Sequence, residues 1–271
     1  MAPIVLLTDF GLSDAFVGIL KGVIHTIAPK AVTIDLGHQV PLGDIQGAAF
    51  LLKISYRFFP EKTIFLTVVD PGVGGERNPI AAQVDSYYCV GPDNGVFGYL
   101  FEESPPREVI LLTEEKYFLQ KISHTFHGRD IFAPTAAHVA NGVALRKLGV
   151  PIENYVPLPF PKARVEESVS VGRIIYQDIF GNLVTSITQK DVQGWTGLKV
   201  HIGDEQITSF VYTYSQVPPG QLLFYFGSSG FLEVACRDSS AAEKLRVQRG
   251  ERVVVERIYE IRGSSRTQRF A

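Results

Sequence analysis

Three side chains with complementary chemistry lie on two glycine-rich segments of this sequence. Asp70 and Arg77 belong to Val69-Asp70-Pro71-Gly72-Val73-Gly74-Gly75-Glu76-Arg77, and His127 belongs to Phe126-His127-Gly128-Arg129-Asp130. A fixed guanidinium lowers the pKa of a neighbouring water molecule, while carboxylate and imidazole groups orient that water and take its proton. An acid, an arginine and a histidine on such turns are therefore candidates for activating water.

The apolar run at 63–68 places Asp70 at a point where ligands commonly bind. This run predicts a buried strand, so Asp70 would follow the strand end, where the ligands of α/β sheets gather. Each residue also has a plainer interpretation when it is taken alone. Asp70 and Arg77 could form an ion pair that only pins the turn, and His127 could be a hydrogen-bonded histidine near a helix start.

Strands and helices alternate in the first half of the chain. This alternation predicts βαβ units and an α/β domain with a largely parallel sheet covered on both faces. The helix starting near residue 15 is expected to take Asp14 as its N-cap. The expected strands are 3–8, 31–36 and 63–69, and the expected helices are 15–27, 44–56 and 130–148.

The second half of the chain has a different pattern. Residues 156–165 contain three prolines, which predict a stiff, extended linker. Short strands separated by turns follow it and predict a small antiparallel barrel or sandwich. These strands are expected at 169–178, 183–187, 198–202, 206–212, 221–226, 231–236 and 252–258. We therefore predict an α/β domain at 1–158, a Pro-rich linker at 159–168 and a smaller β domain at 169–271.

Five motifs occur in an order that resembles the S-adenosylmethionine hydroxide adenosyltransferases over nearly the whole chain. They are Thr8-Asp9-Phe10-Gly11 with Asp14, the loop from Asp70 to Arg77, Gly91-Pro92-Asp93-Asn94-Gly95, Phe126-His127-Gly128-Arg129-Asp130, and Phe180-Gly181-Asn182. That family is related to fluorinating and chlorinating enzymes that use the same substrate. The resemblance implies hydrolysis of S-adenosylmethionine to adenosine and L-methionine by attack of water at the ribose C5′. Asp70, Arg77 and His127 would activate that water.

The same resemblance implies which residues contact the substrate. Asp9 would bind the ribose diol, and Asp178 would pair with the methionine ammonium group. The rings of Phe180 and Tyr214 would cover the adenine, and the Asn182 amide would bind the purine edge. Ser228 and Ser229 would bind the methionine carboxylate. The implied substrate-binding residues are Asp9, Gly128, Asp178, Phe180, Asn182, Tyr214, Ser228 and Ser229. The plainer alternatives are a turn aspartate at 9, a β-hairpin turn at 178–182 and an ordinary loop at 228–230.

Two other functions compete with hydrolysis. The first is a halide-using relative that forms 5′-chloro- or 5′-fluoro-adenosine. Such relatives lack the Asp, Arg and His set, and the fluorinating type carries a serine at the position of Gly128. The second is a non-catalytic sensor that binds S-adenosylmethionine or adenosine.

The composition limits the classes of binding partner and the cellular compartment that we expect for this protein. The net charge of −2, from 26 basic and 28 acidic residues, provides no basic field for nucleic acid, although the tail at 262–269 is locally basic. Cys89 and Cys236 lack a CxxC partner and are expected to be buried thiols in a reducing cytoplasm. No apolar run approaches the roughly 20 residues that span a bilayer. The motif at 91–95 lacks the lysine of a phosphate loop and predicts a tight turn before a helix.

We therefore expect a soluble cytoplasmic protein with S-adenosylmethionine as its substrate. No residue cluster has the spacing of a zinc or calcium site, so we expect neither a metal nor a cofactor. The resemblance further implies a homotrimer whose pockets combine the first domain of one subunit with the second domain of its neighbour.

Overall fold

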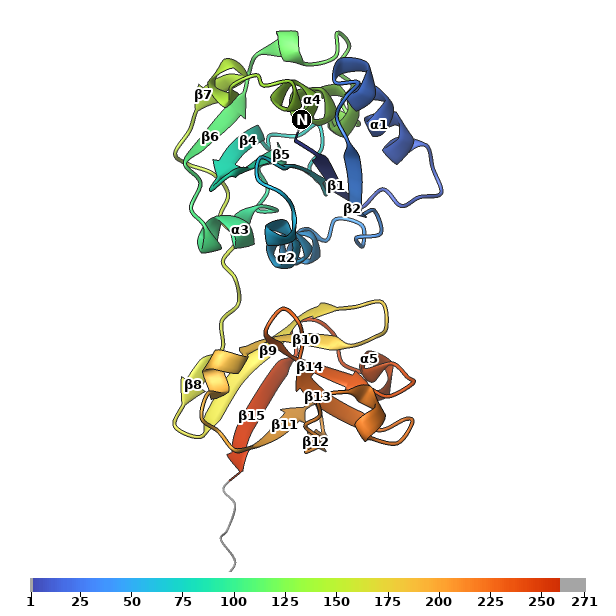
Figure 1. Ribbon diagram of the computed structural model, residues 1–271, viewed down its shortest axis with the longest axis vertical. Helices are drawn as coiled ribbons and strands as arrows, with labels where there is room; N and C mark the ends of the chain where they lie inside the picture. Colours follow the sequence, from blue (N-terminus) through green and yellow to red (C-terminus); the bar gives the residue numbers. More distant parts are fainter. Residues whose placement is uncertain (1, 259–271) are drawn as a thin grey trace, which may run out of the picture. The chain divides into compact units, whose positions relative to one another are not determined.

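The computed structural model of the chain contains two compact units, which divide between Phe160 and Pro161 (Figure 1). The structure describes residues 2–258. The basic tail noted at 262–269 lies outside these residues. None of the helices within the described range is long and apolar enough to cross a membrane.

The first unit is built on a mixed seven-stranded sheet. Its strands are β1 (Ile4–Thr8), β2 (Thr33–Gly37), β3 (Ile64–Val68), β4 (Pro79–Val84), β5 (Tyr87–Pro92), β6 (Glu108–Leu112) and β7 (Gly149–Pro151), in the order β2-β1-β3-β5-β4-β6-β7. The pairs β1–β2, β1–β3 and β3–β5 are parallel, whereas β4–β5, β4–β6 and β6–β7 are antiparallel. The prediction of a largely parallel sheet is therefore not confirmed. Only two residues join β4 to β5, and so short a connection requires an antiparallel pair.

Helices cover both faces of this sheet. β1 shows why, because Ile4 and Leu6 belong to one hydrophobic core, and Val5 and Leu7 belong to the other. The first core includes residues of α1 (Phe16–Ile27) and α4 (Ala133–Ala140), and the second includes residues of α2 (Ile45–Ser55) and α3 (Gly98–Glu103). Figure 1 shows the two pairs of helices on opposite sides of the strands. All five side chains of β1 are buried, as a strand covered on both faces requires.

The helix boundaries differ from expectation at two places. α1 has Ala15 as its N-cap and no side-chain cap, so the prediction that Asp14 caps it is wrong, because Ala15 already has helical dihedral angles. Asp44 does cap α2, since its side chain accepts a hydrogen bond from the Gly47 backbone N–H. The single helix predicted at 130–148 is divided into a π-helical turn (Gly128–Phe132), α4 and a 3-10 turn (Leu145–Lys147). Gly142 ends α4 with a φ of +88°, a conformation that glycine adopts readily.

The second unit is a nearly closed antiparallel barrel. It contains β8 (Arg164–Glu166), β9 (Val169–Gln177), β10 (Leu183–Thr188), β11 (Gly197–Ile202), β12 (Glu205–Ile207), β13 (Leu222–Phe226), β14 (Phe231–Cys236), the short helix α5 (Ala241–Leu245) and β15 (Arg252–Ile258). The strand order is β12-β11-β15-β9-β10-β14-β13, and β8 pairs with β9. The predicted strand at 206–212 ends early, at Ile207. Beyond it the chain crosses to β13, where Val211 N–H donates to the Phe224 carbonyl, and this contact nearly closes the barrel.

The two cysteines are free and buried, which confirms the expectation of unpaired core thiols. Cys89 belongs to the core beneath α2 and α3, and Cys236 belongs to the core of the barrel. Burial raises the pKa of the Cys89 thiol well above its usual range. A thiol in such surroundings packs as a small apolar group.

Candidate active site

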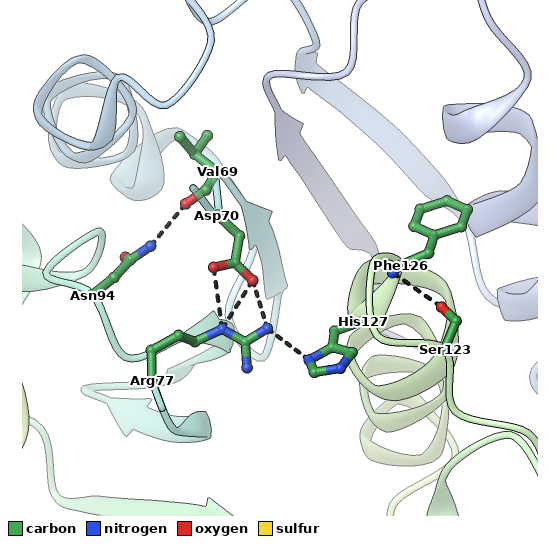
Figure 2. Close-up of polar contacts among 7 residues, drawn as sticks. All are labelled: Val69, Asp70, Arg77, Asn94, Ser123, Phe126 and His127. Carbon is green, nitrogen blue, oxygen red and sulfur yellow. Dashed lines mark hydrogen bonds and ion pairs between the residues drawn. The ribbon is translucent and has the colours of Figure 1, made fainter. Parts of the chain in front are cut away.

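Asp70 and Arg77 form a nearly buried ion pair at the end of β3. Arg77 Nη2 donates to Asp70 Oδ2 at 2.6 Å, and Arg77 Nε lies 2.9 Å from Oδ2 and 3.1 Å from Oδ1 (Figure 2). The two side chains are only 9% and 5% exposed. Separating the two side chains would leave each charge buried without a partner, which is energetically costly. The ion pair therefore holds both side chains in place.

His127 completes the group from the other glycine-rich segment. Its Nδ1 lies 2.8 Å from Arg77 Nη2. A guanidinium can only donate, so Nδ1 must accept, and the ring is neutral with its proton on Nε2. Burial lowers the pKa of His127, and the charge of Arg77 lowers it further, although Asp70, Asp130 and a hydrogen bond to the Ser123 backbone act in the opposite direction. The structure therefore brings together the three residues that the sequence proposed for water activation.

Further contacts support Arg77 and the backbone that precedes Asp70. The guanidinium of Arg77 lies 5.3 Å from the centre of the Phe132 ring, a cation–π arrangement at the start of α4. Asn94 Nδ2 donates to the Val69 carbonyl at 2.8 Å, and Asn94 Oδ1 accepts from Val96 N–H at 3.2 Å (Figure 2). Asn94 therefore anchors the backbone directly before Asp70. The segment at 91–95 contains the end of β5 and the turn that follows it before α3, which agrees with the predicted turn before a helix.

Asp9 lies at the end of β1, the parallel neighbour of β3. Its Oδ2 accepts from Gly43 N–H at 2.9 Å. Burial raises the pKa of Asp9, and the charge of Asp70 raises it further, so the two carboxyl groups are close enough to interact. The carboxyl ends of adjacent parallel strands meet at one edge of the sheet, where α/β proteins bind ligands.

Gly128 is buried beside this edge. A Cβ at Gly128 would lie 3.4 Å from the Phe10 ring and 3.5 Å from Val68 Cγ1. The rings of Phe10, Phe16 and Phe126 make mutual edge-to-face contacts next to it, with centroids 5.3 to 6.0 Å apart. A methyl group at Gly128 would therefore make ordinary van der Waals contacts with its neighbours.

The other predicted binding residues lie in the second unit. Asp178 Oδ1 accepts from the backbone N–H groups of Phe180 and Asn182 at 2.9 and 2.8 Å, and its Oδ2 accepts from Asn182 Nδ2 at 2.8 Å. The segment at 178–182 is therefore the turn between β9 and β10, which was its plainer interpretation. Phe180 is 74% exposed at this turn. Ser228 and Ser229 are exposed on the turn between β13 and β14.

Sequence reasoning missed two residues that join this group. Asn182 Nδ2 lies 3.3 Å from Tyr214 Oη, which lies 2.6 Å from Tyr225 Oη, which in turn donates to Glu233 at 2.6 Å. Burial raises the pKa values of Tyr225 and Glu233. Tyr225 and Glu233 face each other in the β13–β14 ladder, so pairing the two predicted strands would have brought them together. Within residues 2–258, no group of three or more His, Cys, Asp or Glu side chains could hold a metal ion.

Comparisons with known proteins agree over both units. Residues 4–149 match the SAM hydroxide adenosyltransferase N-terminal domain, and residues 172–254 match the C-terminal domain of that family. The chain is 37% identical to an (R)-S-adenosyl-L-methionine hydrolase from Thermus thermophilus, over 92% of this chain and 98% of the relative. It is 36% identical to a Salinispora tropica protein of the same name, over 92% and 95%. Relatives named fluorinases are 23% to 25% identical.

Solved structures show the same likeness. The crystal structure of an uncharacterized conserved protein from Thermotoga maritima superimposes with a TM-score of 0.87 and 35% identity, over 94% of this chain and all of the other.

Proposed function

The chain belongs to the SAM hydroxide adenosyltransferase family, and from this membership we infer that it is an enzyme that hydrolyses S-adenosyl-L-methionine to adenosine and L-methionine. The observation that carries this conclusion is the contact of Asp70, Arg77 and His127 in one hydrogen-bonded group. Relatives at 33% to 37% identity over most of the chain are named as hydrolases of this substrate. The more distant likeness to fluorinases is consistent with a shared substrate.

Positioning the nucleophile matters more for this reaction than supplying a strong acid. Water attacks C5′ of the ribose, and the C5′–S bond breaks with its electron pair passing to sulfur, which leaves neutral methionine. The sulfonium is already a good leaving group, so no proton has to reach it. Holding the water in line with that bond in a closed site could supply roughly 7 to 11 kcal/mol of barrier reduction.

The hydrogen bonds divide the work among the three residues. The guanidinium of Arg77 lowers the pKa of the adjacent water, and Asp70 accepts the proton that the water loses. His127 has no free lone pair, because Nδ1 accepts from Arg77 and Nε2 carries the proton. We therefore assign His127 to holding the guanidinium of Arg77 in place as a hydrogen-bond acceptor, rather than to deprotonating the water.

The remaining substrate contacts belong to the same proposal. Asp9 binds the ribose, Gly128 leaves room beside it, and Asp178, Phe180, Asn182, Tyr214, Ser228 and Ser229 hold the adenine and methionine. The family resemblance supports a homotrimer whose pockets combine the first unit of one subunit with the second unit of a neighbour. The free, buried thiols fit a cytoplasmic protein, and the reaction needs no cofactor besides its substrate.

The test is incubation of the purified protein with S-adenosylmethionine in water enriched in heavy oxygen, with and without chloride or fluoride. Mass spectrometry should find heavy oxygen at C5′ of adenosine under all conditions. A 5′-halogenated nucleoside would instead indicate the halide reaction, and bound but unchanged substrate would indicate a sensor.

A pair of carboxylates on one loop provides the matched control. Asp70→Asn should lower kcat by about 10² to 10⁴, the range for losing a general base, with little change in KM. Glu76→Gln removes an exposed carboxylate from the same loop and should leave both constants unchanged. Equal activity in the two variants would contradict the role of Asp70.

A further inference from the structure

Asp130 is a completely buried carboxylate, three residues after His127, that the proposed reaction does not use. We infer that Asp130 and Ser123 form a clamp that positions His127 against Arg77. Asp130 would be a positioning residue, since its hydrogen bonds reach His127 through neighbouring residues, and its charge in addition raises the pKa of the His127 ring. This inference rests on the proposed function, because the position of His127 affects activity only if His127 belongs to the catalytic group.

The side chain of Asp130 reaches the backbone next to His127 through one intermediate. Asp130 Oδ2 accepts from Ser123 N–H and from Ser123 Oγ, both at 2.8 Å. Ser123 Oγ in turn accepts from Phe126 N–H at 3.0 Å (Figure 2). The hydroxyl therefore uses its donor toward Asp130 and its acceptor toward the residue before His127.

The charge of Asp130 is compensated within the same segment. Arg129 Nε donates to Asp130 Oδ1 at 2.6 Å, and the guanidinium lies 5.1 Å from the centre of the Phe126 ring. Burial raises the pKa of Asp130, but the hydrogen bonds from Arg129 and Ser123 outweigh it and hold the pKa below its ordinary value, so the carboxylate remains ionised and able to accept all these bonds. Arg129 thus stabilises the ionised form of Asp130. Among the hydrogen bonds of residues 2–258, none joins the Arg129 side chain to Asp70, Arg77 or His127.

The backbone of Asp130 holds the other end of the same loop. In an α-helix the Asp130 carbonyl would accept from residue 134, but Pro134 has no N–H to donate. The chain instead forms a π-helical turn at Gly128–Phe132, and the Asp130 carbonyl accepts from Leu119 N–H at 2.9 Å. Such single π turns are frequent at functional sites. The residue therefore fastens the loop at position 119 by its backbone and at position 123 by its side chain.

This loop also touches the turn that carries Asp70 and Arg77. A Cβ at Gly74 would lie 2.1 Å from the His124 carbonyl oxygen, so the two backbones are packed without room for a side chain. The loop at 119–126 thus lies against the turn at 70–77 on one side and leads into His127 on the other. A clamp on the loop sets the relative position of both halves of the catalytic group.

Ser123→Ala tests the clamp with a mild change, because Ser123 is only partly buried. We expect kcat to fall about 10- to 100-fold, the effect of a displacement near 1 Å, with KM within about twofold of the wild type. Ser123→Thr restores the hydroxyl and should recover most of kcat. Thr125→Ala, an exposed change in the same loop, should have no effect. Asp130→Asn keeps an acceptor for Ser123 and should remain more active than Asp130→Ala.

A measurement that does not need turnover separates this inference from the proposed function. Nitrogen-15 NMR of the histidine rings, assigned with His127→Gln, should show His127 as the Nε2–H tautomer with a low pKa. In Ser123→Ala its pKa should move toward 6.5, the ordinary value, whereas Thr125→Ala should leave it unchanged.

The possible outcomes are distinct. An unchanged His127 ring in both Ser123→Ala and Asp130→Ala, with wild-type kcat where turnover occurs, would overturn the clamp. A wild type that releases no adenosine would overturn the proposed function, while the ring signals would still decide whether the clamp exists.

Discussion

The guanidinium of Arg77 determines the hydrogen-bonding state of both of its neighbours. It donates to Asp70 and to His127, and it cannot accept from either. Asp70 thereby acts only as an acceptor toward Arg77, and His127 is held as a neutral ring. A planar fork makes these contacts simultaneously, which a point charge on a flexible stem would not reproduce.

Replacing this fork while keeping its charge should therefore be costly. We predict that Arg77→Lys lowers kcat by about 100-fold or more, a loss comparable to removing a general base, with a smaller change in adenosine affinity. Steady-state kinetics and calorimetric titration with adenosine would measure the two effects. Arg107→Lys provides a control, because Arg107 is exposed between α3 and β6 and belongs to neither the catalytic group nor the clamp. Retention of wild-type kcat in Arg77→Lys would mean that charge alone suffices.

The pH dependence should report the neutral state of His127. Burial and Arg77 lower the pKa of this ring below 6.5, so kcat/KM should stay high as pH falls through 6.5 and decline only at lower pH. The unfolded chain takes up this proton first, so protein stability should begin to fall as pH drops through 6.5. Kinetic and thermal profiles would show both. This decline of kcat/KM at low pH should be absent in His127→Gln but present in Asp9→Asn. A decline centred at or above pH 6.5 in the wild type would contradict the lowered pKa of His127.

At the scale of elements, the site depends on how closely β3 and β5 approach. Gly91 lies in β5, and a Cβ there would come within 2.2 Å of the Thr67 carbonyl oxygen in β3. This close contact lets Asn94, three residues later, reach the Val69 carbonyl. The sheet and the turn before α3 therefore hold Asp70 from two sides.

Glycine replacements in two elements should have opposite effects on stability. Gly91→Ala should force β3 and β5 apart and lower the free energy of unfolding by about 1 to 3 kcal/mol, as overpacking does. Gly22 lies on the exposed face of α1, and a Cβ there would have no neighbouring atom within 4 Å. Gly22→Ala should therefore raise that free energy by about 0.5 to 1 kcal/mol. Denaturant titration of both variants would measure the difference. Equal stabilities would show that the close approach is not a constraint.

At the scale of the whole molecule, the proposed site residues divide between two units. Asp70, Arg77, His127, Asp9 and Gly128 belong to the first unit, and the other proposed substrate contacts belong to the second. A chain with this division can complete its pocket with a neighbouring copy, as a closed ring of identical subunits allows.

Mixing two defective subunits tests this arrangement. We predict that Asp70→Ala and Asn182→Ala subunits, each of low activity alone, regain activity when they are refolded together. Some pockets would then combine an intact first unit with an intact second unit from another chain. Light scattering should give a mass near three times 29.9 kDa for the wild type. Absence of recovery in mixed oligomers would place each pocket within one subunit.

The sequence by itself determined most of the local structure and the chemical candidates. Apolar periodicity located β1, β3 and α2, the Asp44 side chain marked the start of α2, and motif order identified the family. These features depend on neighbours close in the chain, so they can be seen in the sequence.

Tertiary structure alone decided how distant parts meet. The antiparallel pairing of β6 with β4 and with β7, the crossing of the chain to β13 after Ile207 and the contact of His127 with Arg77 join segments whose spacing carries no signal. The break of the predicted helix at 130–148 into a π turn and α4 depends on both levels. Pro134 removes a donor locally, but only the folded chain brings Leu119 to the Asp130 carbonyl. Burial then sets the charge states, because the pKa values depend on which groups packing brings together.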